Sequence, residues 1–294
     1  MFMTVLVGID GHAGGHDAVV LARQLAAPRA GITLAHVYAA GLLYGGAHRL
    51  RLAPVDRVGE LLERERDAAL LDAPLVTYGD RSVGRGLHRL AELERVDLLV
   101  VGSCRRGPLG RVLRGSDMLA ALSGAPCAVA IAPIGYAARA GGLSAIGVGS
   151  DGSLASDQGL LVARELAGRH ASRVKVLAVS SLQAIPYGES IPLDWLNAEK
   201  RALAEKLARL GGLRGVEAEV TYGEPQEELA AFAEELDLLI VGSRSYGHIG
   251  RLVNGSVSRY LAERVRCPLL VLPRNARKEE ADADAGAESV ASHA

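Results

Sequence analysis

Two glycine-rich stretches contain residue types that can bind a negatively charged group. They are VGSCRRGPLGRVLRGS at Val101–Ser116 and VGSRSYGHIGRLVNGS at Val241–Ser256. Eight of the sixteen positions are identical, including four glycines and the closing serine. Each stretch follows an apolar run and leads into a helical pattern. Glycines let the backbone approach a ligand closely, and a helix start presents unpaired amides at the positive end of its dipole. This arrangement predicts an anion site, usually for phosphate.

A second interpretation of these glycines is purely structural, because they could simply shape a tight connection between a strand and a helix. Neither stretch contains G-x-x-x-x-G-K-[ST] or G-x-G-x-x-G, the two better-known phosphate-binding loops. From the residues alone, both interpretations stay open. In the second stretch, Ser256 is predicted to be the N-cap of the helix that follows.

The glycine-rich stretches belong to a longer internal repeat. The second begins 140 residues after the first, because 241 minus 101 is 140. TVLVGIDG at Thr4–Gly11 corresponds to AIGVGSDG at Ala145–Gly152, and VTYGD at Val76–Asp80 corresponds to VTYGE at Val220–Glu224. Repeats of this length indicate two similar domains, since solenoid repeats are much shorter.

Within each copy, short apolar runs alternate with helical patterns. The apolar runs are continuous, which is typical of parallel strands that are covered on both faces. Apolar residues at helical spacing predict helices at 18–27, 58–71 and 86–96. The order in each half is therefore β-α-β-α-β-α-β-α-β. We expect an α/β fold with two tandem doubly wound, mostly parallel five-stranded sheets.

These patterns divide the chain into four parts. We expect an N-terminal domain at 1–136, a linker at 137–144, a C-terminal domain at 145–274 and a disordered tail at 275–294. The tail is rich in Ala, Asp and Glu and has no aromatic residue, so it offers little apolar surface to bury.

Composition excludes several functional classes. The formal net charge is −1, which provides no global attraction to nucleic acid or to an anionic membrane. Three cysteines without close spacing do not form a disulfide framework or a zinc site. The longest uncharged run, residues 118–138, is interrupted by two glycines and two prolines, unlike a helix that spans a bilayer. We therefore expect a cytoplasmic protein that binds neither nucleic acid nor membranes.

With these residues in view, the chain resembles the universal stress protein family in its tandem, two-domain form. Family members that bind ATP carry the motif G-x2-G-x9-G-[ST] after the fourth strand. Both copies here match its frame, but the second glycine is replaced in each. The first copy has Gly102, Arg105, Gly115 and Ser116, and the second has Gly242, Ser245, Gly255 and Ser256.

The resemblance also implies further site residues. An aspartate after the first strand faces the base and ribose, which corresponds to Asp10 and to Asp151 with the adjacent Gly152. A backbone contact to adenine comes from the end of the second strand, at Val37 and Val179. Amides near residues 255–257, including that of Val257, would hold phosphate. The implied fold is a Rossmann-like sheet of the adenine-nucleotide α-hydrolase type.

The implied function is binding of ATP or a related adenine nucleotide, with Mg²⁺ as an optional companion. Because Ser245 is small and Arg105 is bulky, we expect binding chiefly in the C-terminal half. The sequence shows no evident general base or magnesium-binding carboxylate pair, so we expect a regulatory module without catalysis. A slow ATPase stays open, as does a partner-binding scaffold whose clefts no longer bind nucleotide.

The fifth strands, CAVAIAP and CPLLVLP, would lie at sheet edges that need covering. In the family that the chain resembles, such edges pair across a two-fold axis. We therefore expect the two halves to form an intramolecular pseudo-dimer related by a pseudo-two-fold axis, with a homodimer as a further option.

Overall fold

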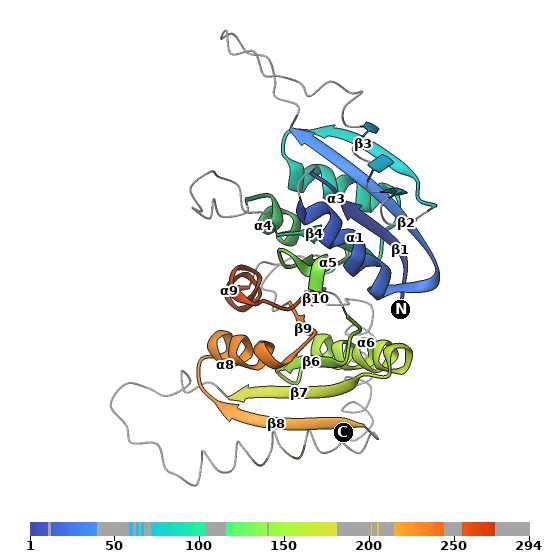
Figure 1. Cartoon of the computed structure of the whole chain (residues 1–294). Helices are drawn as coiled ribbons and strands as arrows, with labels where there is room; N and C mark the ends of the chain where they lie inside the picture. Colours follow the sequence, from blue (N-terminus) through green and yellow to red (C-terminus); the bar gives the residue numbers. More distant parts are fainter. Residues whose placement is uncertain are drawn as a thin grey trace, which may run out of the picture.

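The apolar runs of the sequence form ten strands in the described residues, and helices separate them along the chain (Figure 1). The structure, a computed structural model, describes residues 1–10, 13–39, 59–60, 63–64, 66–67, 72–103, 116–139, 141–180, 201, 205, 215–243 and 255–273.

The two copies of the repeat give corresponding sets of elements. The first comprises β1 (Phe2–Gly8), α1 (Ala13–Leu25), β2 (Ala26–Ala39), β3 (Leu75–Asp80), α3 (Val83–Leu93), β4 (Leu98–Gly102), α4 (Ser116–Leu122) and β5 (Ala128–Ala132). A short helix, α5 (Tyr136–Arg139), follows. The second comprises β6 (Ala145–Ser150), α6 (Leu154–His170), β7 (Arg173–Ser180), β8 (Val216–Tyr222), α8 (Pro225–Phe232), β9 (Leu238–Gly242), α9 (Ser256–Arg264) and β10 (Leu269–Leu272). A 3₁₀ turn at Ala233–Glu235 extends α8.

The predicted helices exist, but their ends differ from those expected. The helix predicted at 18–27 begins earlier and ends at Leu25, because Ala26 already pairs with Phe2 as the start of β2. The helix predicted at 86–96 covers Val83–Leu93 instead. It starts early because the Ser82 side chain caps it, accepting a hydrogen bond of 3.3 Å from the amide of Arg85. In the predicted helix 58–71, residues 59–60, 63–64 and 66–67 are helical, and most of the others lie outside the described residues.

The strands form one continuous sheet in the order β3-β2-β1-β4-β5-β10-β9-β6-β7-β8. Pairing is parallel within each half, which confirms the predicted doubly wound, five-stranded units. The fifth strands are not left as free edges. They pair antiparallel, with Leu270 opposite Ala130, and so join the two units through the middle of the molecule. Strand order reverses between β1 and β4 and between β6 and β9, where doubly wound sheets bind ligands.

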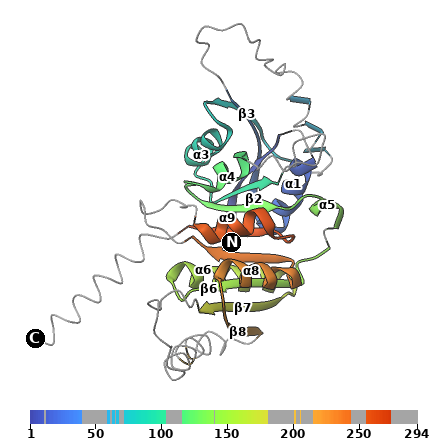
Figure 2. The same ribbon diagram turned by 90° about the vertical axis from the view of Figure 1, so that its left-hand side faces the viewer.

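Helices cover both faces of the sheet, and each core runs through both halves. One core lies between the sheet and α1, α5 and α6, with Leu21 and Leu166 among its buried members. The other lies beneath α3, α4, α8 and α9, with Leu90 and Leu261 buried. Figure 2 shows α1 and α3 on opposite sides of the upper half. This three-layer arrangement buries the continuous apolar strands on both faces, as their sequence predicts.

A buried carboxylate holds part of the connection between the halves in place. Helix α5 falls largely within the stretch predicted to be a linker, and Asp17 of α1 holds its start. The Asp17 carboxylate accepts hydrogen bonds of 2.8 Å from the amides of Gly135 and Ala137. The Tyr136 hydroxyl donates to the side-chain oxygen of Gln24. The junction is therefore packed against α1.

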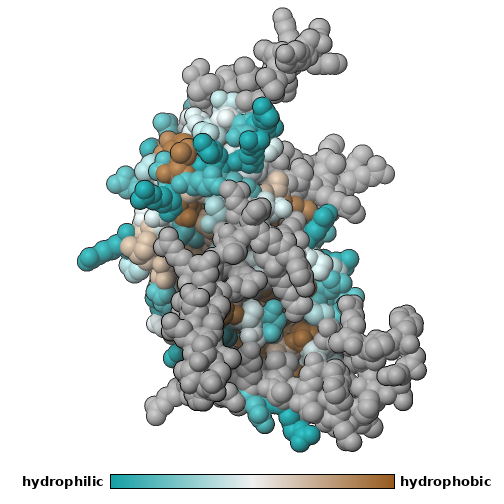
Figure 3. Space-filling model, turned by 180° about the vertical axis from the view of Figure 1, so that it is seen from behind, coloured by the Kyte–Doolittle hydropathy of each residue, from teal (hydrophilic) through white to brown (hydrophobic). Residues whose placement is uncertain are grey.

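The molecular surface carries both apolar and polar residues on the face that Figure 3 shows. On the face in Figure 3, apolar residues of the described chain form separate small patches among polar ones. In the described part of the chain, no helix combines the length and hydrophobicity that crossing a lipid bilayer would need.

Candidate functional site

A cavity of about 110 Å³ lies at the reversal point of the second half, beyond the ends of β6 and β9. It collects residues from five separate parts of that half. Those expected from the sequence are Asp151, Val179, Gly242, Gly255, Ser256 and Val257. Those that sequence reasoning missed are Gly149, Ser150, Leu177, Pro225, Leu229, Val241 and Ser258.

The start of α9 forms one wall of this cavity. The prediction that Ser256 is the N-cap is wrong, because Ser256 is the first helical residue and Gly255 is the N-cap, at φ −65° and ψ 150°. The Gly255 carbonyl accepts hydrogen bonds from the Ser258 hydroxyl and the Arg259 amide, both at 3.1 Å. The first-turn amides of a helix have no intrahelical acceptor. Ser256, Val257 and Ser258 line the cavity, which places the positive end of the α9 dipole beside it.

Gly242 ends β9 where the backbone runs close to the first helix of its half. A Cβ at position 242 would lie 2.8 Å from the Cβ of Ala155 in α6. In the first half the constraint is stronger, since a Cβ on Gly102 would lie 1.9 Å from the Gly14 carbonyl oxygen. Helix packing thus explains both glycines without a ligand, as the structural interpretation of the loops required. Gly242 nevertheless also lines the cavity.

Asp151 stands at the mouth of the cavity, directly after β6. One of its carboxylate oxygens accepts a hydrogen bond of 3.0 Å from the Ser153 amide, which holds the side chain in a tight turn. Gly152 is not among the residues that line the cavity. Its φ of +75° allows the turn, and its amide donates to the Ser150 hydroxyl at 3.3 Å. The structure thus places the expected acceptor at the cavity and gives Gly152 a supporting role.

The apolar wall comes from β7 and from the start of α8. Val179, near the end of β7, lines the cavity with Leu177 and Leu229. A Cβ on Gly149 would lie 2.9 Å from a methyl carbon of Leu229, so the glycine leaves room for that leucine. Leu229 and Pro225 were missed because nothing in the sequence tells which loop folds over the strand ends. The only available signal was the proline at position 225, shortly after β8 ends at Tyr222, where it begins α8.

The corresponding residues of the first half are only partly described. Asp10 follows β1, Gly102 ends β4 and Ser116 is the first residue of α4. Val37 is buried in β2. It packs closely against Gly86 of α3, because a Cβ added at position 86 would lie 2.4 Å from a methyl carbon of Val37. Gly115, Arg105 and Ser245 lie outside the described residues, as does the predicted tail at 275–294.

The lining of the cavity suits a ligand with apolar, polar and anionic parts. Its apolar wall suits a flat ring, the Asp151 carboxylate can accept from an amine or hydroxyl, and the α9 amides can donate to an anion. Within the described ranges, no cluster of three or more His, Cys, Asp or Glu side chains could hold a metal ion. The thiols of Cys127 and Cys267 lie elsewhere, and burial raises the pKa of each to about 12, so both stay protonated at neutral pH.

Comparison with known proteins agrees with this architecture. The model of the universal stress protein family matches residues 1–133 and 143–273. A universal stress protein of Mycobacterium tuberculosis is 29% identical over 247 residues, which is 76% of this chain and 84% of that protein.

Two solved structures share the fold at low sequence identity. A universal stress protein from Archaeoglobus fulgidus superposes with a TM-score of 0.62 and 18% identity, covering 92% of this chain and 98% of that one. A functionally unknown protein from Pseudomonas aeruginosa gives a TM-score of 0.64 and 16% identity, covering 100% and 98%. Because the family model matches both halves, the chain belongs to the universal stress protein family.

Proposed function

We propose that this protein binds an adenine nucleotide, with ATP as the leading candidate, chiefly in its C-terminal half. The observation that carries the proposal is the convergence of Asp151, Val179 and the first turn of α9 on one cavity. The ring would lie against Val179 and Leu177, and the ribose or base would donate to Asp151. The phosphates would accept from the amides of Ser256 and Val257.

The size of the cavity indicates which part of the nucleotide it would enclose. Small-molecule sites usually measure roughly 300–1,000 Å³. A cavity of about 110 Å³ is smaller than this range, so the described residues would enclose only part of a nucleotide. Residues 244–254 connect Ser243 to Gly255 and lie outside the described residues, so the phosphate side is argued from α9 alone.

The preference for the C-terminal half is supported by comparing the two copies. The second half has a described cavity with the nine-residue helix α9 at its edge. The sequence places the bulky Arg105 where the second copy has Ser245. We therefore propose that any site at Asp10, Val37, Gly102, Gly115 and Ser116 is the weaker one.

The test is titration calorimetry of the full chain with ATP, with and without Mg²⁺. Asp151→Ala removes a charged acceptor, and because hydrogen bonds to charged groups contribute about 1.5–3 kcal/mol, affinity should fall by about 10- to 100-fold. The matched control is Asp10→Ala, which makes the same change after β1 and should alter affinity less than about twofold. Equal losses in the two variants would refute the preference for the second half, and the absence of binding heat would refute the proposal.

We propose a regulatory role without catalysis, in a cytoplasmic protein whose halves act as an intramolecular pseudo-dimer. The described cavity residues include one carboxylate, that of Asp151, whereas phosphoryl transfer normally uses bound Mg²⁺ together with a residue that positions the nucleophile. Steady ATP turnover that disappears in Asp151→Ala would instead support the ATPase alternative. The division at 136 and 145 and the option of a homodimer remain predictions.

A further inference from the structure

The outermost strands of the two halves differ in register, although both contain VTYG. In β3, Val76 pairs with Ala35, and Tyr78 pairs with Val37. Val179 is the counterpart of Val37, yet its partner in β8 is Thr221 rather than Tyr222. Strand β8 is therefore displaced by one residue relative to β3, and such a shift turns every side chain to the opposite face of the sheet.

The displacement changes which residues face the helices. In the first half, Val76 and Tyr78 pack into the core beneath α3. In the second half, Val216 and Val220 pack on the side of α6. Glu217, Glu219 and Thr221 consequently face α8. The second half thus presents a polar, acidic sheet face where the first half presents an apolar one.

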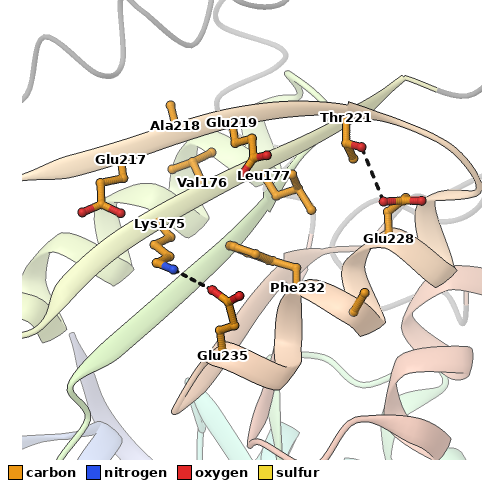
Figure 4. A pocket seen from close by; sticks show the side chains of 11 residues that line it. Lys175, Val176, Leu177, Glu217, Ala218, Glu219, Thr221, Glu228, Phe232 and Glu235 are labelled. Atoms are coloured by element: carbon orange, nitrogen blue, oxygen red, sulfur yellow. Dashed lines mark hydrogen bonds and ion pairs between the residues drawn. The ribbon is translucent and has the colours of Figure 1, made fainter.

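This face forms a groove of about 500 Å³ between α8 and strands β7 and β8 (Figure 4). It stays open because α8 packs mainly over β7, whereas α3 packs over both β2 and β3. Phe232 lies in the middle of the groove, and carboxylates surround it. At one end, Lys175 donates to Glu235 at 2.8 Å, and at the other, Thr221 donates to Glu228 at 3.5 Å.

The groove has a surplus of negative charge. Lys175 is the one cation among its eleven lining residues, and it is already engaged with Glu235. Glu217, Glu219 and Glu228 form no ion pair with any other described residue. Three carboxylates next to an aromatic ring are complementary to arginine, whose planar guanidinium binds carboxylates and stacks on aromatic faces.

The position of the groove favours an extended chain as its occupant. Strand β8 is the last strand of the sheet, and its outer edge pairs with no other strand of the described residues. An added strand would place alternate side chains beside Glu217 and Glu219, which have the same spacing of two residues. A second copy of β8 is disfavoured, because like charges opposite each other destabilise paired strands.

We propose that the groove along β8 is a docking site for an extended partner segment with basic residues, above all arginine, at alternate positions. The segment would pair with the edge of β8, and its basic side chains would lie over Glu217 and Glu219 towards Phe232. The groove shares only Leu177 with the nucleotide cavity, and none of its carboxylates line that cavity, so docking does not depend on the proposed nucleotide function.

The probe is the end-blocked, fluorescently labelled peptide Val-Arg-Val-Arg-Val, titrated with the full chain and followed by anisotropy. We expect saturable binding that weakens as salt increases. Glu219→Lys should reduce affinity by at least about fivefold, because a cross-strand attraction becomes a repulsion. Glu219→Gln should give a smaller loss and serves as the second variant if the lysine variant unfolds.

Two controls separate docking from general charge attraction. Glu234→Lys makes the same charge change on the 3₁₀ turn after α8 but outside the groove, and it should change affinity less than twofold. The peptide Val-Val-Arg-Arg-Val has the same composition without alternation and should bind more weakly. No saturable binding, equal losses at 219 and 234, or equal affinity for the two peptides would each overturn the proposal.

Discussion

Gly102 and Gly242 show how packing can produce the same residue pattern as ligand binding. We expect Gly102→Ala to lower the free energy of unfolding by about 1–3 kcal/mol, because its new Cβ would collide with the Gly14 backbone. Gly168→Ala is the matched control, since a Cβ there meets no atom within 4 Å on helix α6. That variant should gain about 0.4–1 kcal/mol.

Urea denaturation followed by circular dichroism measures both changes. If Gly102→Ala were as stable as the wild type, the close approach to α1 would not constrain this position. Motif spacing placed Gly242 at the end of a strand, because it fixes where a loop leaves that strand, and the family resemblance pointed to Asp151. The spacing could not distinguish a glycine needed by a helix from one needed by a phosphate, since both require the same close approach of the backbone.

At the scale of elements, Asp17 and Asp157 both lie in the first helix of their half, α1 and α6, but have different surroundings. Asp17 is 3% exposed and accepts two amide hydrogen bonds from the start of α5. The buried Oδ1 of Asp157 has no hydrogen-bond partner in the described part of the chain. We expect Asp17→Ala to destabilise the fold by about 1–3 kcal/mol, because it leaves buried amides without acceptors. Asp157→Ala should cost less.

Chemical denaturation of the two variants side by side tests this difference, and a larger loss of stability for Asp157→Ala would contradict it.

The helices and strands also show which features the sequence could predict and which it could not. The continuous apolar runs predicted strands reliably because burial on both faces demands them. The matching VTYG motifs could not reveal the one-residue displacement of β8, since register depends on which neighbouring pairs form across the sheet.

At the scale of the whole molecule, the β5–β10 pair makes two sequence repeats into one sheet with shared cores. We therefore expect a single cooperative unfolding transition. Cys127 and Cys267 report on the two halves separately, because each is buried just before the fifth strand of its half. Both thiols should become reactive towards a maleimide over the same range of urea concentration, as quantified by mass spectrometry of each cysteine.

If Cys267 reacted at clearly lower urea concentration than Cys127, the halves would unfold independently and the shared sheet would not couple them.

The duplication itself was evident from the sequence, because two copies of one pattern at a fixed spacing require two like folds. The joining of two five-stranded units into one sheet was anticipated only through the exposed edges of the fifth strands.

The most direct test of the central claim is a crystal structure of the full chain grown with ATP and Mg²⁺. The account predicts density for the adenine ring beside Val179 in the second half, with phosphate oxygens within hydrogen-bond distance of the amides of Ser256 and Val257. An empty cavity in the second half, or nucleotide bound only beside Asp10 in the first, would contradict it.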